Sequence, residues 1–318
     1  MPIGEFELIE RYLSRLGAHR DDVVLGIGDD AALLRPPPGT ELASAIDTIV
    51  ESVHFPVGMP AADVGHRVLA VNLSDMAAMG AEPAWALLTL TLPVADEAWL
   101  RDFAAGLHDL ARRHGTALVG GDTTAGPLTA TVAITGFVPP GQALRRSGAH
   151  PGDEVWVSGT PGDAAAGLAV LQGKLDGPDA ILEPLRQRFL RPEPRVGLGL
   201  CLRSVATACI DVSDGLVGDL GKLCQSSGVG AELDSTLLPR SAAMRGAVDP
   251  EAARRFTLAG GDDYELLFTL PPGSDTALLQ RGGGVAVTRI GVIAAGAGIA
   301  VDGEPAGREL VHGFDHFR

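Results

Sequence analysis

Aspartates stand at the ends of apolar segments and in glycine turns along this chain, and their placement is the first feature that could do chemistry. They end or follow the segments VVLGIG, LASAID, AVNLS, ALVGG, ATACI and TLAGG. In an α/β fold, ligand sites gather at strand ends. A single aspartate there is most simply an N-cap or turn residue. Six such clusters favour a shared site, because converging carboxylates repel one another unless cations neutralise them.

Carboxylates without clustered His or Cys are typical of sites for hard cations. Mg²⁺ is the usual ion when phosphates supply the remaining oxygens, so the pattern predicts nucleotide chemistry. The chain has no GxxxxGK[ST] loop, because both of its Gly-Lys pairs are followed by Leu. Metal ions would then take over the neutralising role of the missing lysine. Arg145 and Arg146 are candidates for clamping a phosphate, with a solvated linker pair as the alternative.

Two other kinds of site are disfavoured by the sequence. Gly26, Gly28 and Ala31 imitate a dinucleotide fingerprint, but Asp29 and Asp30 would place two negative charges against the pyrophosphate. A GxSxG motif is absent, which argues against a serine hydrolase of that type.

Composition limits the class of protein. The 318 residues suit about two domains of roughly 150 residues. The 25 basic and 40 acidic residues give a formal charge of −15, which disfavours nucleic acid and anionic membrane surfaces as partners. The chain has no apolar run of about 18 residues and begins with several acids. Its three cysteines lack zinc-ligand spacing and suit a reducing compartment. We therefore expect a cytoplasmic protein.

Apolar periodicity predicts alternating helices and strands. In the first half we expect helices over 6–16, 60–80 and 99–115, and strands over 42–47, 85–92, 117–119 and 128–137. In the second half we expect a strand over 154–158, helices over 164–171 and 181–190, and a strand before Asp211. The Pro- and Gly-rich segment 139–153 is the predicted boundary, giving domains of 1–140 and 150–318.

Two short features occur in both halves and suggest a duplicated ancestry. One is a Ser-Asp pair expected to open a helix, and the other is a Gly-Gly-Asp expected to follow a strand. The residues concerned are Ser74, Asp75, Gly121, Asp122, Ser213, Asp214, Gly261 and Asp262.

Ten ordered motifs give the chain a specific resemblance over almost its whole length. They are GIGDDAAL (26–33), DTIVESVHF (47–55), AVNLSDMAAMGAEP (70–83), GGDTTAGP (120–127), RRSG (145–148), GTPGDAAAGL (159–168), RPEPRV (191–196), IDVSDGLVGDL (210–220), GGDDYELLFTL (260–270) and GFDHF (313–317). With these motifs the chain resembles the thiamine-monophosphate kinase family, within the superfamily of aminoimidazole ribonucleotide synthetase.

The resemblance implies an α/β fold with two domains. The N-terminal domain would bind ATP and Mg²⁺, and its mixed sheet would pair with that of a second subunit to form a homodimer. The C-terminal domain would also be α/β, with ATP at the cleft between the two. The implied reaction is ATP-dependent phosphorylation of thiamine monophosphate to thiamine diphosphate by direct in-line transfer with several Mg²⁺ ions. It is the last step of thiamine diphosphate biosynthesis.

The resemblance also implies roles for individual residues. Position by position, the metal ligands are Asp30, Asp47, Asp75, Asp122, Asp211 and Asp214, of which Asp75, Asp122 and Asp211 are the catalytic set. The implied ATP contacts are Gly121, Asp122, Arg146 and Ser213. The implied substrate contacts are His54, Asp262 and Phe314; taken alone, His54 could equally be a strand-edge histidine.

The chain departs from the family pattern at a few of these positions. Asp262 stands where relatives more often carry Glu, and Phe314 replaces the commoner Tyr or Trp. Ala45 and Ile46 stand where relatives often offer hydroxyls, so only their backbone carbonyls could reach a metal. These departures concern individual contacts and leave the implied activity unchanged.

Two alternatives to this activity remain open on the sequence alone. The first is a sibling enzyme, such as aminoimidazole ribonucleotide or selenophosphate synthetase. The selenophosphate enzyme would want a reactive Cys near the N-terminus, and here the first cysteine is Cys201. The second is a non-catalytic protein that binds nucleotide and metal.

Overall fold

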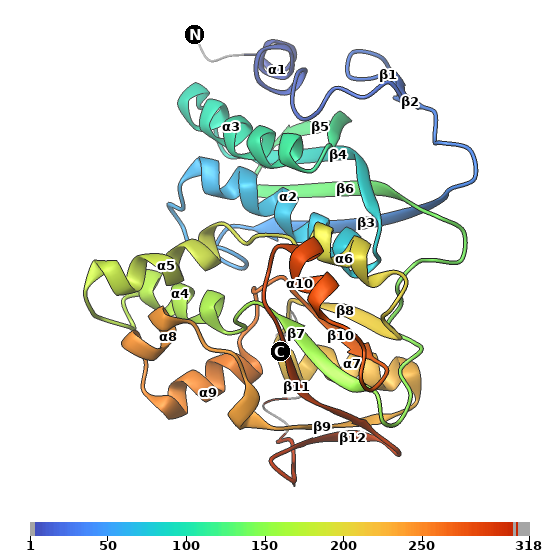
Figure 1. Ribbon diagram of the computed structural model, residues 1–318. Helices are drawn as coiled ribbons and strands as arrows, with labels where there is room; N and C mark the ends of the chain where they lie inside the picture. The colour runs from blue at the N-terminus through green and yellow to red at the C-terminus, as the bar shows by residue number, and fades with distance from the viewer. Residues whose placement is uncertain (1–3, 308–309, 311–318) are drawn as a thin grey trace. The chain divides into compact units, whose positions relative to one another are not determined.

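The computed structural model describes residues 4–307 and 310 of the chain, which forms two compact units (Figure 1). The first unit runs to Met76 and continues over Ala81–Gly141. The second comprises Ala77–Gly80 and the chain from Gln142 onward. The division after Gly141 falls inside the Pro- and Gly-rich segment 139–153. No helix within the described residues is long and apolar enough to cross a membrane.

The first unit is built on a four-stranded sheet. The strands lie in the order β3 (Glu41–Val50), β6 (Thr129–Val138), β4 (Glu82–Leu92) and β5 (Ala117–Ala125). The β3/β6 and β6/β4 pairs are antiparallel, whereas β4 and β5 are parallel. Along β6, buried Ala130, Val132 and Ile134 alternate with half-buried residues, so the strand predicted over 128–137 is confirmed and has one covered face.

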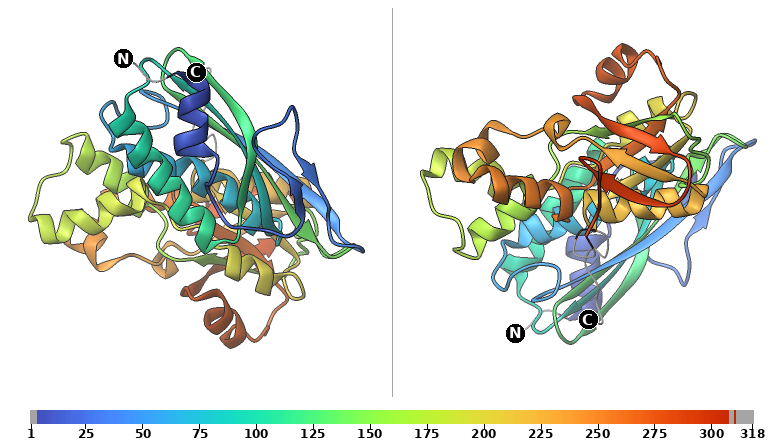
Figure 2. Two further views of the ribbon diagram at one scale, coloured as in Figure 1. Left: turned by 90° about the horizontal axis from the view of Figure 1, so that it is seen from above. Right: turned by 90° about the horizontal axis from the view of Figure 1, so that it is seen from below.

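Helices α2 (Ala61–Ala78) and α3 (Glu97–Arg113) lie together on one face of this sheet (Figure 2). The Asp96 side chain caps α3 by accepting from the Ala98 and Trp99 amides at 2.8 and 3.1 Å. Glycines let the two helices approach closely. A Cβ at Gly65 would lie 2.0 Å from the Phe103 carbonyl oxygen. The predicted helices are confirmed, and they pack closely against each other.

The N-terminal segment differs from its predicted single helix. Helix α1 (Glu5–Leu8) passes into a π-helical turn, η1 (Ile9–Leu13), and the chain then leaves helical structure. Gly17 does not cap a helix; it has φ +86° and bridges to Ala117, where a Cβ would lie 2.4 Å from the Thr116 carbonyl oxygen. The segment continues into a small hairpin of β1 (Val23–Leu25) and β2 (Leu33–Leu34).

The second unit contains a seven-stranded sheet. Its strands lie in the order β13 (Glu304–Pro305), β12 (Gly298–Val301), β9 (Gly230–Leu233), β11 (Val287–Ala294), β7 (Glu154–Ser158), β10 (Glu265–Leu270) and β8 (Ala208–Val212). Neighbouring strands are antiparallel except for the parallel pair of β12 and β9. Helix α7 (Leu216–Ser227) covers the sheet with buried Leu216, Leu220 and Leu223.

Four helices of the second unit form a separate group around their own apolar core. Helices α4 (Asp163–Leu171), α5 (Asp179–Leu190), α8 (Ala242–Ala247) and α9 (Pro250–Ala259) pack through Ala166, Leu185, Met244 and Ala253 (Figure 1). The unit also holds α6 (Val196–Leu202), α10 (Ala277–Gly283) and the short helix η2 (Ser235–Leu237). The strand and helices predicted over 154–190 are confirmed.

The positions predicted for the Ser-Asp and Gly-Gly-Asp features of the two halves are mostly wrong. Ser74 and Asp75 lie inside α2, because neither Pro nor Gly interrupts the helical pattern there. Asp122 lies within β5, which runs on past the predicted end at residue 119. Asp262 follows helix α9 and precedes β10. Asp214 alone keeps the expected position, just before α7.

Candidate functional site

A cavity of about 890 Å³ lies in the first unit, between the N-terminal segment and the sheet face opposite the helices. The segment 27–32 forms one wall and strands β4, β5 and β6 form the other. Its acidic lining consists of Asp29, Asp30 and Asp122, and Gly121 lies beside them. The structure therefore brings together three of the sequence-predicted site residues, namely Asp30, Gly121 and Asp122.

The wall that carries Asp30 is shaped by a tight turn. Gly28 adopts φ +121°, which favours glycine. The Asp29 carboxylate then accepts the Asp30 amide at 2.8 Å. The Asp29 carboxylate is thus hydrogen-bonded to the amide of the next residue. The Asp30 and Asp122 side chains are exposed at the cavity.

The opposite wall requires glycine at position 121. Gly121 has φ +149°, and a Cβ there would lie 1.8 Å from the carbonyl oxygen of Leu88 on the neighbouring strand. Only glycine fits so close an approach. The close approach of Gly121 to β4 therefore fixes the backbone position of Asp122, the next residue.

A polar and aromatic anchor holds the N-terminal segment against the sheet. Arg20 donates to the Asp22 carboxylate at 2.7 Å and to the Gly115 carbonyl at 2.8 Å, and Trp85 Nε1 donates to Asp22 at 2.9 Å. Trp85 meets Phe137 edge-to-face at 5.0 Å, and the Arg20 guanidinium lies 5.5 Å from the Phe137 ring centre. The hydrogen bond from Arg20 holds the pKa of Asp22 below its usual value. This anchor fixes the segment from which the cavity wall continues.

Two further predicted ligands of the first unit lie on the other side of the sheet. Asp47 lies within β3, and its amide donates to the Asn72 side chain on α2 at 3.0 Å. Asp75 follows Asn72 by one turn on the same helix face. Asp47 and Asp75 therefore lie on the α2 side, whereas Asp30 and Asp122 face the cavity. Over residues 4–307 and 310, no three His, Cys, Asp or Glu side chains form a group that could hold a metal ion by themselves.

His54 follows β3 in a turn that fixes its ring. Its Nδ1 accepts the Val50 amide at 3.0 Å, and its own amide donates to the Val50 carbonyl at 2.9 Å. This bond assigns the ring proton to Nε2. The imidazole is half-buried and held in one orientation.

In the second unit, Asp211, Ser213 and Asp214 lie at the end of edge strand β8. Asp211 is buried within the strand. The Asp219 carboxylate accepts the Ser213 and Asp214 amides, both at 2.9 Å, which shapes the turn into α7. Lys222 pairs with Asp214 and, at 2.7 Å, with Asp219. A lysine thus already neutralises part of the negative charge here.

The other predicted contacts of the second unit lie on loops. Arg146 is exposed, and its carbonyl accepts from Ser227 Oγ at 2.9 Å. Asp262 has φ +69°, and its amide donates to the Ser213 carbonyl at 2.9 Å. Phe314 lies outside the described residues.

Comparison with known proteins identifies the family. The families described as AIR synthase related protein, N-terminal domain and C-terminal domain, match residues 28–138 and 150–304. The chain is 50% identical to thiamine-monophosphate kinase of Escherichia coli K12 over 323 aligned residues, covering 100% of this chain and 99% of the relative. The chain belongs to the thiamine-monophosphate kinase family.

Solved structures of this family share the fold. Thiamine-monophosphate kinase from Stenotrophomonas maltophilia matches with a TM-score of 0.88 and 50% identity, over 96% of this chain and 99% of that one. The structure of AaThiL complexed with AMPPCP and TMP matches with a TM-score of 0.79 and 33% identity, over 92% of each chain. The α/β fold class implied by the resemblance is confirmed.

The second unit of this thiamine-monophosphate kinase family member contains a buried charged network that was not predicted from the sequence. Its members are Asp163, Arg188, Arg195, Asp263 and Glu265. The motifs GTPGD, RPEPR and GGDDYEL carry all of them except Arg188. The adjacent acids of the GGDDYEL motif were the one sequence signal for this network. Their buried partners lie far away along the chain, so the pairing could not be read from the sequence.

Burial has opposite outcomes for two acids of this network. It raises the pKa of Asp263 to about 8, against the opposing effects of the Arg188 charge and the Gly162 and Ala164 amides. Burial also opposes ionisation of Glu265, but the hydrogen bond from Arg195 and the charges of Arg188 and Arg195 outweigh it. The pKa of Glu265 is therefore below its usual value.

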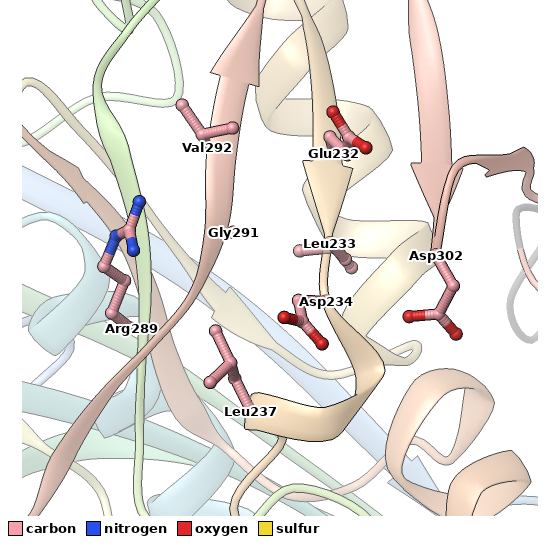
Figure 3. A pocket seen from close by; sticks show the side chains of 8 residues that line it. All are labelled: Glu232, Leu233, Asp234, Leu237, Arg289, Gly291, Val292 and Asp302. Atoms are coloured by element: carbon pink, nitrogen blue, oxygen red, sulfur yellow. The ribbon is translucent and has the colours of Figure 1, made fainter.

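A second pocket, of about 440 Å³, lies in the second unit between β9, β11 and the turn after β12 (Figure 3). Two of its three acids are engaged in local structure. Asp234 caps η2 through Thr236, and Asp302 accepts from Ser235 and from Arg254 at 3.0 Å. Arg289 pairs with Glu154 at 3.2 Å. We assign no ligand to this pocket.

Proposed function

We propose that this protein phosphorylates thiamine monophosphate with ATP by direct in-line transfer, giving thiamine diphosphate and ADP. Membership of the thiamine-monophosphate kinase family supports the reaction. The observation that carries the site is the cavity of about 890 Å³ that Asp30, Gly121 and Asp122 line. It is large enough for a nucleotide. Its apolar walls suit a base, and its acids suit metal-bound phosphates.

The cavity's donors fit Mg²⁺. Asp30 and Asp122 offer hard carboxylate oxygens without competing His or Cys, and nucleotide phosphates would complete the coordination. The resemblance also implies Asp47 and Asp75, on the α2 side of the sheet, and Asp211 and Asp214 of the second unit as metal ligands. These carboxylates would hold Mg²⁺ ions other than the one bound in the cavity. When bound, Mg²⁺ neutralises the repulsion between the donor and acceptor phosphates.

The chain has little proton chemistry to perform in this reaction. The acceptor is a phosphate with a second pKa of about 6, so it is largely ionised at neutral pH and needs no strong general base. The side chains therefore bind, orient and neutralise. Asp75, Asp122 and Asp211 form the catalytic set of carboxylates.

The remaining roles divide between nucleotide and acceptor. Gly121, Asp122, Arg146 and Ser213 contact ATP. His54, Asp262 and Phe314 contact thiamine monophosphate. The corresponding domains are 1–140, for ATP, Mg²⁺ and dimerisation, and 150–318.

The protein acts as a cytoplasmic homodimer in this proposal. On the sheet face opposite α2 and α3, Leu42 and Ile46 of β3 keep 53% and 66% of their surface exposed. Large apolar side chains exposed on one face of a sheet favour burial against a second copy. The acidic composition and three cysteines without disulfides among the described residues support the cytoplasmic location.

Product analysis tests the proposed function. Purified protein is incubated with ATP, Mg²⁺ and thiamine monophosphate, and products are identified by mass. We expect equal amounts of thiamine diphosphate and ADP, and none from Asp75→Asn. ADP without thiamine diphosphate would contradict the proposed acceptor. Turnover of Asp75→Asn at the wild-type rate would remove Asp75 from the metal set.

A further inference from the structure

The loop 260–264 of the second unit runs along the end of β8 and presents alternate side chains in opposite directions. Its backbone is tied to that strand, since the Asp262 amide donates to Ser213 and the Tyr264 amide to Val212, both at 2.9 Å. The Asp263 carboxylate turns to the start of α4 and accepts the Gly162 amide at 2.6 Å. The loop therefore fixes Asp262 relative to the strand end that carries Ser213.

This loop holds a backbone conformation that its residues do not favour. Asp262 and Tyr264 have φ values of +69° and +52°, in the left-handed region. Such residues persist only where the surroundings over-determine them, and they cluster at binding sites. Something rigid must therefore hold the loop next to Asp262.

The rigid element is the carboxylate of Glu265, which directly follows the loop and is fully buried. Arg195 donates to its two oxygens at 2.7 and 2.5 Å, a bidentate pair. Arg188 Nη2 donates to the same carboxylate at 2.7 Å and to the Asp263 carbonyl at 3.3 Å. Ser158 Oγ also donates to it. Arg188 thus joins the buried carboxylate to the loop backbone.

The carboxylate of Glu265 packs directly against the backbone of Gly159. A Cβ at Gly159 would lie 2.0 Å from Glu265 Oε1, and Gly159 has φ +60°. The glycine of the GTPGD motif therefore makes space for the ion pair. Replacing Glu265 would leave two arginines without their buried counter-charge.

We propose that Glu265, clamped by Arg188 and Arg195, is a positioning residue that holds Asp262 in the geometry that binds thiamine monophosphate. Glu265 touches no substrate and acts through the loop. This inference rests on the proposed function, and within it the network sets affinity for the acceptor.

The test compares steady-state kinetics of the full-length wild type, Glu265→Gln and Asp153→Asn. Asp153 is a matched control, because it is another buried carboxylate of this unit, bonded to Thr207 and His150 at the opposite end of β7. For Glu265→Gln we expect KM for thiamine monophosphate to rise by about tenfold or more, with less change in KM for ATP. Asp153→Asn loses thermal stability but keeps KM for thiamine monophosphate within about twofold of wild type.

Arg195→Lys keeps the positive charge but loses the bidentate geometry. It is the second test variant, to be used if Glu265→Gln does not fold. We expect it to raise KM for thiamine monophosphate by a smaller factor. A double-mutant cycle identifies the route: in an Asp262→Ala background, either network substitution leaves this KM unchanged.

Two results would overturn the positioning role. One is a KM for thiamine monophosphate that follows thermal stability alone, equally in the network variants and in Asp153→Asn. The other is a KM change that persists in the Asp262→Ala background. Failure of the proposed function is recognised separately, because the wild type itself would then form no thiamine diphosphate.

Discussion

At the scale of single residues, Asp122 is the carboxylate on which the cavity assignment depends most. It is exposed on β5 and lines the cavity, so replacing it with the isosteric Asn leaves strand pairing intact. We predict that Asp122→Asn lowers kcat/KM by about a hundredfold, because a neutral amide binds Mg²⁺ weakly. Coupled measurement of ADP release checks this, with unchanged circular dichroism as the control. Wild-type kcat/KM would remove Asp122 from the site.

Also at this scale, Asp22 makes the stability of the first unit depend on pH in the acid range. Its folded-state pKa is depressed, so its ion pair with Arg20 stabilises fully above the usual carboxyl pKa of about 3.9. That contribution is lost as pH falls through the depressed value. We predict that Asp22→Asn lowers unfolding free energy by about 1 kcal/mol at pH 7. The difference should shrink as pH falls below 4 in urea titrations. A difference independent of pH would contradict the ion-pair account.

At the scale of elements, the approach of β5 to β4 is set by one glycine. We predict that Gly121→Ala destabilises the protein by about 2 kcal/mol or more, because the new Cβ would lie 1.8 Å from the Leu88 carbonyl oxygen. Gly120→Ala is the matched comparison, since its Cβ would meet only the Leu87 side chain, at 3.0 Å. Thermal unfolding of both variants measures the difference. Equal losses would show that close backbone approach is not the cause.

Elements with clear periodicity could be predicted from the sequence, and those shaped by tertiary contact could not. Helix α3 carries an apolar stripe and a capping aspartate, both of which are local signals. The φ of +86° at Gly17 accompanies its bridge to Ala117, about a hundred residues away along the chain. Ser74 and Asp75 were predicted to begin a helix because Ser and Asp are favoured N-cap residues, but both lie inside α2.

The candidate site divides in the same way. The family resemblance implied site roles for Asp30, Gly121 and Asp122, and the structure places all three at one cavity. The network around Glu265 was not predicted. Its partners Arg188 and Arg195 are 77 and 70 positions away, and a single sequence does not reveal which distant charges pair.

At the scale of the whole molecule, the open sheet face of the first unit predicts self-association. Ile46 is the more exposed of the two large apolar residues on β3 there, at 66%. We predict that Ile46→Glu shifts the wild-type dimer to monomer in sedimentation velocity, because an unpaired charge in a buried interface is costly. Gln172→Glu, at an exposed position of the second unit, serves as a surface control with the same change of charge. A wild type that sediments as a monomer would contradict the dimer.

The direct test of the central claim follows the phosphoryl group itself. ATP carrying heavy oxygen in its non-bridging γ-phosphoryl positions is mixed with the protein, Mg²⁺ and thiamine monophosphate, and products are resolved by mass. Direct transfer predicts all of the label in the terminal phosphoryl group of thiamine diphosphate, with unlabelled ADP. Label recovered as inorganic phosphate, with thiamine monophosphate unchanged, would contradict the account.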